Sequence, residues 1–221
     1  MTYVRDANAR VTQKRARRGQ QSTILQRVGM GVVGRLIPDL VDGHLPVGTY
    51  LCTLEELEAT FVDAAQFAAS GSRRAVFDGL VDYLADWEAV ESDLQVKVLK
   101  RLWVGGSFTS GAVEVGDVDI SPFLDSDVLG SLRGRPGAGQ LKALYQHRDK
   151  IKSTYRVEPF VVLWKPFTTL KLRNLEAEEY EYVATRGMMD DFWQRTTDLS
   201  VKQAMLSEDA EPARGYLEVT L

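Results

Sequence analysis

The stretch from Leu102 to Ser121 restricts the possible folds of this chain more than any other part of the sequence. It starts as an apolar strand and runs into a glycine turn, Gly105-Gly106-Ser107, with a third glycine at Gly111. It ends in a second predicted strand that carries Asp117 and Asp119. Because glycine has no Cβ, such a turn lets the backbone approach a ligand closely, and a serine with neighbouring amides can hold a phosphate oxygen. The stretch therefore predicts a strand–turn–strand unit with a phosphate-binding turn.

The two aspartates of this stretch point to a divalent cation. Residues two apart on a strand face the same side, so Asp117 and Asp119 converge while Val118 and Ile120 face a core. Two carboxylates about 4 Å apart repel by roughly 4 kcal/mol at a protein-like effective dielectric. Mg²⁺ relieves such a conflict and is commonly held by carboxylates together with substrate phosphates and water. We therefore expect a nucleoside triphosphate site with Mg²⁺ or Mn²⁺. The alternative is an ordinary hairpin with a solvated acidic face.

The order Gly-Ser, three residues, Gly, a short spacer and Asp-x-Asp resembles the signature of the DNA polymerase β-like nucleotidyltransferase superfamily. The resemblance is closest to its small bacterial and phage members, which often occur in toxin–antitoxin or defence loci. It extends over residues 45–221 and implies an α/β (α+β) fold with one mixed β-sheet flanked by helices. It also implies that Gly105, Gly106, Ser107 and Gly111 bind the nucleotide and that Asp117 and Asp119 bind the metal.

Enzymes of this superfamily use a third carboxylate on a neighbouring strand, and the resemblance assigns that role to Glu158. It would bind the metal and accept a proton from the attacking hydroxyl. The sequence departs from the family pattern here, because the family residue is usually Asp and because Pro159 follows, which suits an edge strand or a bulge. The alternative is an exposed edge-strand glutamate paired with Arg156. A second departure is Ala112, which stands after Gly111 where a basic residue is expected.

The N-terminal region differs in charge from the rest of the chain. The formal net charge of −4 argues against a surface that coats nucleic acid, yet the first residues are rich in cations: Arg10, Lys14, Arg15, Arg17 and Arg18. These side chains are candidates for contact with nucleic-acid phosphates or with an acidic partner, and the alternative is a solvated tail. We expect residues 1–44 to form a basic arm and a helix, and residues 45–221 to form the nucleotidyltransferase-like domain.

The sequence also bears on the compartment. A single cysteine, Cys52, excludes an internal disulfide and is consistent with a reducing cytoplasm. No apolar run approaches the roughly 20 residues of a membrane span, and the basic N-terminal residues are not followed by the apolar run of a secretory signal. We therefore expect a cytoplasmic protein with no membrane contact.

Hydrophobic periodicity and capping signals predict the remaining elements. A capping box at Thr53 predicts a helix through Phe67, and Ser72 is expected to cap a second helix that breaks at Ser92-Asp93. Alternation from Leu94 to Val98 predicts a strand or a short helix. Further predicted elements are a helix over 141–151, a strand over 155–164, a long acidic helix over 175–195 and a last strand over 214–221.

Three functions are consistent with these features. The first is a nucleotidyltransferase that moves an NMP from an NTP to a hydroxyl on RNA or protein. The second is a nucleotidyltransferase-fold binding protein or antitoxin with weak or no turnover. The third is a nucleic-acid-binding module in which the basic arm makes the contacts. The fold alone cannot choose among them, because this superfamily acts on many acceptors.

Overall fold

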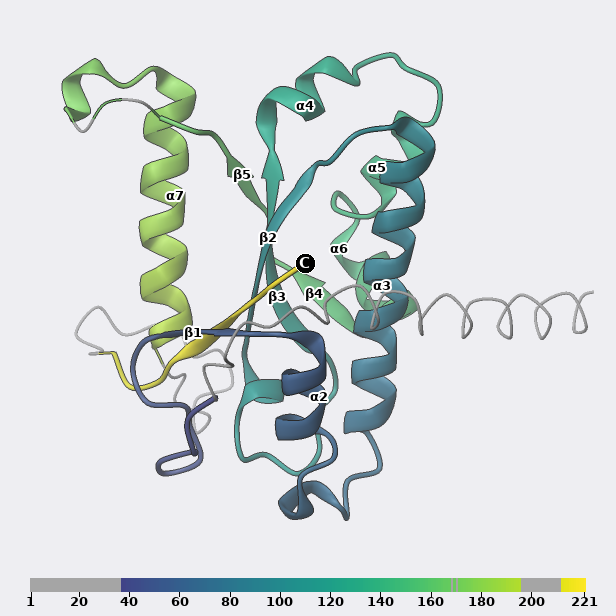
Figure 1. The fold of residues 1–221 in the computed structure, drawn as a ribbon, viewed down its shortest axis with the longest axis vertical. Coiled ribbons are helices and arrows are strands. Elements are labelled where there is room, and N and C mark those ends of the chain that lie inside the picture. Colours follow the sequence, from purple (N-terminus) through teal and green to yellow (C-terminus); the bar gives the residue numbers. More distant parts are fainter. Residues whose placement is uncertain (1–36, 168, 170, 196–211) are drawn as a thin grey trace, which may run out of the picture. The chain divides into compact units, whose positions relative to one another are not determined.

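A mixed β-sheet forms the centre of the computed structural model, which describes residues 37–167, 169, 171–195 and 212–221 (Figure 1). Its strand order is β1-β6-β2-β3-β4, and β5 pairs with β3 beyond the end of β4. Pairing is antiparallel for β2 with β3 and with β6, and parallel elsewhere. The strands are β1 Thr49–Cys52, β2 Leu99–Gly105, β3 Val118–Asp125, β4 Val157–Pro159, β5 Val162–Trp164 and β6 Tyr216–Val219. The expected α/β class with one mixed sheet is confirmed.

Helices cover both faces of this sheet, and Figure 1 shows α7 alone on one side with α3, α5 and α6 on the other. The α-helices are α2 Leu54–Phe61, α3 Arg73–Leu94, α4 Ser126–Ser131, α5 Ala138–Ala143, α6 Arg148–Tyr155 and α7 Ala177–Gln194. Short 3₁₀ helices are η1 Ala65–Phe67, η2 Ser107–Thr109 and η3 Leu172–Asn174. Among the described residues, no helix combines the length and the apolar character that crossing a membrane requires.

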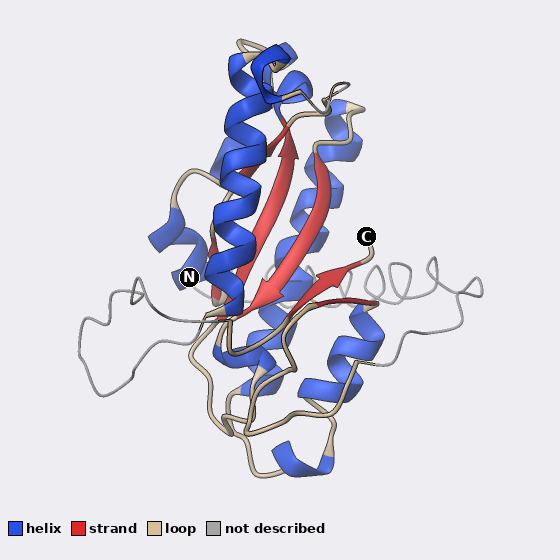
Figure 2. Ribbon diagram, turned by 90° about the vertical axis from the view of Figure 1, so that its left-hand side faces the viewer, coloured by secondary structure: helices blue, strands red, loops and turns tan. Residues whose placement is uncertain are grey.

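The alternation of side chains along β3 separates two hydrophobic cores. Val118, Ile120 and Leu124 enter the larger core, which contains the buried face of α3. Phe123 enters the smaller core beneath α7, where Trp193 is also buried. Each fully buried large apolar side chain contributes about 1.5–3 kcal/mol to the free energy of folding. Figure 2 shows the long central strands β2 and β3 side by side. This antiparallel pair contributes buried side chains to both cores.

Helix α2 begins where its capping box predicts but is shorter than expected. Thr53 and Glu56 exchange both hydrogen bonds of the box, which confirms the predicted start. The helix ends at Phe61 instead of Phe67, and a separate 3₁₀ turn follows. The carbonyl of Phe61, the last residue of the helix, accepts a hydrogen bond from the buried guanidinium of Arg73, a side chain outside the helix.

Helix α3 starts after Ser72 as predicted, but Ser72 does not cap it through its side chain. The Ser72 hydroxyl instead donates to Glu114 and accepts from the amide of Val115. The helix continues past the predicted break to Leu94, and β2 does not begin until Leu99. The element expected over 94–98 is therefore wrong. Local alternation there reflects the burial of the helix end and of Val98 rather than a strand.

Two other predicted elements are each divided in the structure. The helix expected over 141–151 is two helices, α5 and α6, and both contribute buried side chains to the larger core. The strand expected over 155–164 is also wrong as a single element, because Tyr155 ends α6 and two short strands follow Arg156. Pro159 ends β4 and has no N–H for the ladder. The amide of Phe160 bonds to the carbonyl of Ile120, and pairing with β3 resumes in β5.

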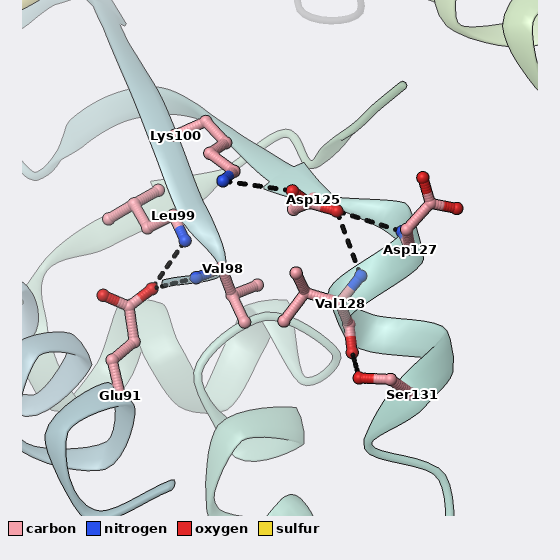
Figure 3. Close-up of polar contacts among 8 residues, drawn as sticks. All are labelled: Glu91, Val98, Leu99, Lys100, Asp125, Asp127, Val128 and Ser131. Atoms are coloured by element: carbon pink, nitrogen blue, oxygen red, sulfur yellow. Dashed lines mark hydrogen bonds and ion pairs between the residues drawn. The ribbon is translucent and has the colours of Figure 1, made fainter. Parts of the chain in front are cut away.

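Buried carboxylates organise one end of the β2–β3 pair (Figure 3). Glu91 is 4% exposed and accepts hydrogen bonds from the amides of Val98 and Leu99, each at 2.6 Å. Asp125 ends β3 and caps α4 by accepting from the amides of residues 127 and 128. The ammonium nitrogen of Lys100 lies 3.1 Å from Oδ2 of Asp125. The negative charges at this end are therefore balanced by backbone N–H donors and by two lysines, since Glu91 also pairs with Lys97.

Candidate metal centre

Three carboxylates meet at the opposite end of β3. Asp117 immediately precedes the strand, Asp119 lies within it, and the parallel register of β3 and β4 pairs Asp119 with Glu158. One oxygen from each carboxylate lies within 4.8 Å of the others, a spacing that could hold a metal ion. Oxygen ligands of this kind suit Mg²⁺ or Mn²⁺. The structure thus brings together the three residues that the sequence proposed as ligands.

Local folding explains why these side chains share one face. The amide of Val118 bonds to the carbonyl of Arg156, which aligns the start of β3 with the start of β4. Val118 and Val157 are completely buried in the larger core. Because side chains alternate along a strand, burial of these two valines turns the neighbouring carboxylates to the α7 side of the sheet.

Two cations from α6 balance the carboxylates. The ammonium group of Lys152 contacts both Asp117 and Glu158, and the guanidinium of Arg148 contacts Glu158. Arg148 also lies over the ring of Phe160, 4.2 Å from its centroid. The ion pairs of Glu158 are thus with Lys152 and Arg148, and not with Arg156 as in the alternative interpretation. Lys152 was not among the predicted site residues, although its spacing of four residues from Arg148 puts both cations on one side of α6.

These contacts give the carboxyl groups different acidities. The pKa of Asp119 is raised from 3.8 to about 6, first by burial and then by the charges of Asp117 and Glu158. The charges of Lys152 and Arg214 lower it by a smaller amount. Burial also opposes ionisation of Glu158, but its contacts with Lys152 and Arg148 outweigh burial and lower its pKa. Hydrogen bonds to Asp117 and Glu158 raise the pKa of Lys152 above its usual value. Asp119 is the group whose charge is least well compensated.

The glycine turn lies directly against Asp119. Gly105 ends β2 opposite Asp119, and Gly106 follows with φ of +72°. A Cβ on Gly106 would stand 1.8 Å from Oδ2 of Asp119, so no other residue fits there without displacing the carboxylate. A Cβ on Gly105 would stand 2.6 Å from the indole of Trp193. Both glycines are therefore required by close approach at the site, and Gly106 also by its backbone conformation.

The other two residues predicted to bind the nucleotide lie farther along the turn. Ser107 is exposed and begins η2 directly after Gly106. Gly111 packs on the chain before β1, where its N–H donates to the carbonyl of Gly43 at 2.8 Å. A Cβ on Gly111 would stand 3.3 Å from Cα of Gly43. In this structure Gly111 thus joins the turn to a neighbouring segment.

A buried arginine that sequence reasoning missed holds the turn in place. Arg73 is 1% exposed, and its guanidinium donates to the carbonyls of Phe61, Phe108, Ser110 and Ala112. Burial lowers its pKa to about 10, so it remains charged at neutral pH. No local pattern marks Arg73, since its partners come from distant parts of the chain. Carbonyl oxygens compensate its charge, and the turn after η2 is fixed to the start of α3.

Comparison with known proteins places the chain in a family without assigning its activity. Residues 38–220 match a family of unknown function, DUF6932. The chain belongs to this family. No curated protein and no solved structure matches it. For this DUF6932 member, the acidic cluster is a possible metal site. The five cations proposed for the basic arm, at positions 10, 14, 15, 17 and 18, lie outside the described residues, and the boundary at residue 45 stays a prediction.

Proposed function

We propose that this DUF6932 protein is a metal-dependent nucleotidyltransferase that moves an NMP from an NTP to a hydroxyl on RNA or protein. One observation carries the proposal: the register that sets Glu158 beside Asp119 also brings Asp117 within reach, under a turn that must be glycine at Gly106. Acidic ligands next to a turn of this kind suit a metal-bound triphosphate. The proposal agrees with the resemblance to small polymerase β-like nucleotidyltransferases, from which a role in a toxin–antitoxin or defence system is also proposed.

The side chains have distinct proposed tasks. Asp117, Asp119 and Glu158 would hold Mg²⁺ or Mn²⁺, which when bound would offset negative charge on the triphosphate and on the leaving pyrophosphate. The amides after Gly106 and the hydroxyl of the exposed Ser107 would hold phosphate oxygens. Glu158 stays ionised at neutral pH because of Lys152 and Arg148, and it can therefore serve as a ligand and accept the proton of the attacking hydroxyl.

One observation favours the alternative of a nucleotidyltransferase-fold binding protein. The ammonium of Lys152 already bridges Asp117 and Glu158, so a fixed internal cation could take the place of the metal. A scaffold of this type would keep its charge balance without turnover. Nucleotide binding that does not depend on a divalent cation would support it.

A transfer assay tests the proposal. The full chain is incubated with Mg²⁺ or Mn²⁺ and each α-labelled nucleotide, with total RNA or cell lysate as acceptor. The double variant Asp117→Asn, Asp119→Asn is run beside it, and Asp127→Asn serves as control because Asp127 is an exposed carboxylate on α4. We expect label on one acceptor class from the wild type and the control, and at least about a hundredfold less from the double variant.

The result also separates the alternatives. No transfer by a wild-type protein that binds nucleotide without a divalent cation would replace the enzyme with the binding protein. No transfer and no nucleotide binding would remove the reason for treating the carboxylates and the glycine turn as one site.

A further inference from the structure

The charge of the Arg214 guanidinium acts on Asp119, yet Arg214 forms no ion pair with any of the three carboxylates of the site. Arg214 precedes β6 and is fixed to the end of α7: its backbone N–H donates to Gln194, and its Nε donates to the carbonyl of Trp193, each at 3.1 Å. Among the described residues, that Nε bond is the one hydrogen bond of the guanidinium, and no carboxylate forms an ion pair with it. Within the described part of the chain, its two terminal nitrogens have no hydrogen-bond partner, and there they can bind a ligand.

Trp193 connects Arg214 to the glycine turn. Its indole lies against Gly105, close enough that a Cβ there would stand 2.6 Å from the ring. The indole N–H donates to the hydroxyl of Ser121 at 2.9 Å, on the same face of β3 as Asp119. The residue that anchors Arg214 is therefore also the one that covers the turn beside Asp119.

A second connection fixes the backbone on the other side of Arg214. The amide of Gly215 donates to the carbonyl of Leu45 at 2.8 Å, and a Cβ on Gly215 would stand 2.2 Å from the carbonyl oxygen of Pro46. Gly43, two residues before Leu45, accepts the hydrogen bond from the N–H of Gly111 at its carbonyl. The start of β6 and the end of the glycine turn are therefore held by one short piece of chain.

The charge of Arg214 acts on the site without neutralising it. Burial lowers the pKa of Arg214, and the charge of Asp119 opposes that shift. Lys152, in contrast, contacts its carboxylates directly. A partly desolvated guanidinium with free terminal nitrogens suits a phosphate group, which it can bind through two parallel hydrogen bonds.

We propose that Arg214 binds phosphate oxygens of the nucleoside triphosphate beyond the α-phosphate, held for this by Trp193 and the segment 43–46. The inference rests on the nucleotidyltransferase function proposed above and adds a phosphate-binding residue outside the glycine turn. It predicts that Arg214 distinguishes triphosphates from monophosphates. It also predicts that Arg214 does not strengthen binding of the metal alone.

The test compares Arg214→Gln and Arg214→Lys with wild type in the full chain. Mn²⁺ binding is measured alone by electron paramagnetic resonance, and Mn²⁺-dependent binding of the tri- and monophosphates of the four nucleosides by calorimetry. For Arg214→Gln we expect triphosphate affinity to fall at least about tenfold and monophosphate affinity less than about threefold. Mn²⁺ affinity should stay the same or rise, because a cation near Asp119 is removed. Arg214→Lys should retain part of the triphosphate affinity.

Arg101→Gln is the matched control, because Arg101 is an exposed arginine paired with Glu218 on the same sheet. It should bind all ligands as wild type does. Wild-type triphosphate affinity in Arg214→Gln would overturn the role of Arg214 while leaving the metal centre intact. Loss of both Mn²⁺ and triphosphate in Arg214→Gln would make Arg214 structural and also overturn it. Failure of the wild type to bind either Mn²⁺ or nucleotide would remove the proposed function itself.

Discussion

The two ends of β3 differ in the groups that balance the charge of their carboxylates. At the Asp125 end, Asp125 and Glu91 each accept hydrogen bonds from two backbone amides (Figure 3). Each also forms an ion pair with a lysine, Lys100 for Asp125 and Lys97 for Glu91. At the other end, Asp117, Asp119 and Glu158 face one another, and among the described residues no backbone amide donates to any of them. Their balance comes from long side chains on α6.

This difference separates structural charges from charges available to a ligand. A carboxylate that accepts hydrogen bonds from backbone amides is stabilised wherever the fold is intact, so it favours folding. Few of its lone pairs remain for a ligand. Carboxylates that face one another oppose folding unless a cation joins them, which is typical of functional sites. The contrast yields measurable consequences at each end.

The largest expected effect is on stability at the Asp125 end. Glu91→Ala leaves the amides of Val98 and Leu99 without their acceptor in a buried position. Each unsatisfied amide costs about 1–3 kcal/mol, so we expect the free energy of unfolding to fall by about 3 kcal/mol. Urea denaturation measures this loss, and Mn²⁺ binding by the folded variant should match wild type. A loss below about 1 kcal/mol would mean that these hydrogen bonds are not structural.

At the acidic cluster of Asp117, Asp119 and Glu158, a carboxylate should have the opposite effect on stability. The pKa of Asp119 is raised from 3.8 to about 6, so its charged form is disfavoured in the folded protein. Stability is therefore lost as pH rises from about 4 to 6, and the full penalty remains above pH 6. The shift corresponds to a penalty of about 3 kcal/mol. Asp119→Asn removes the charge but leaves a buried polar group, so it should stabilise the metal-free protein by about 2 kcal/mol at pH 7.5, while abolishing Mn²⁺ binding.

Urea denaturation at pH 4.5 and at pH 7.5 measures this effect, and the gain should be smaller at the lower pH. Asp125→Asn is the matched variant. Hydrogen bonds from backbone amides and the contact with Lys100 outweigh burial and lower the pKa of Asp125, so its carboxylate contributes stability above the unfolded pKa that is lost on acidification. This variant should destabilise the protein at pH 7.5. Stabilisation by both variants, or by neither, would contradict the contrast between the two ends.

A smaller effect is expected at the internal cation. Lys152 contacts Asp117 and Glu158, so its ammonium competes with a metal for the same oxygens. Lys152→Met should tighten Mn²⁺ binding about tenfold, which corresponds to about 1.4 kcal/mol. Mn²⁺ titration followed by electron paramagnetic resonance measures it. Lys150→Met, which removes an exposed lysine from the same helix, should leave the affinity unchanged. Weaker Mn²⁺ binding by Lys152→Met would contradict this competition and would mean that Lys152 stabilises the metal-bound protein.

The smallest effect concerns Asp127, beside the satisfied carboxylates. It is 60% exposed at its side chain and pairs with Lys165. Exposed ion pairs contribute little, so Asp127→Asn should change the free energy of unfolding by less than about 0.5 kcal/mol. A change above about 1 kcal/mol in urea denaturation would show that charge near this end of β3 matters beyond its backbone hydrogen bonds.

Local signals in the sequence were enough to predict the framework of the fold. The alternation of Val118 and Ile120 with two aspartates predicted which side of β3 is buried, and the capping box at Thr53 predicted the start of α2. The strand β1 was not predicted. Its first three residues are not fully buried, and it forms only by pairing with β6 at the other end of the chain.

The parts of the site that were missed depend on contacts between distant segments. Arg73 donates to carbonyls more than 30 positions away, and Arg214 donates to the carbonyl of Trp193, 21 positions before it. Lys152 lies close to Glu158 in sequence, yet its contact with Asp117 requires β3 and β4 to be parallel neighbours. Sequence patterns identify residues suited to a metal, but the fold decides which cations reach them.

The most direct test of the acidic cluster is the binding of Mn²⁺ to wild type, Glu158→Gln and Asp125→Asn, measured by electron paramagnetic resonance. We expect wild type to bind Mn²⁺ at one centre, Asp125→Asn to bind it equally well, and Glu158→Gln to bind it at least about tenfold more weakly. Absence of Mn²⁺ binding by wild type, or equal binding by wild type and Glu158→Gln, would show that the three carboxylates do not form a metal centre.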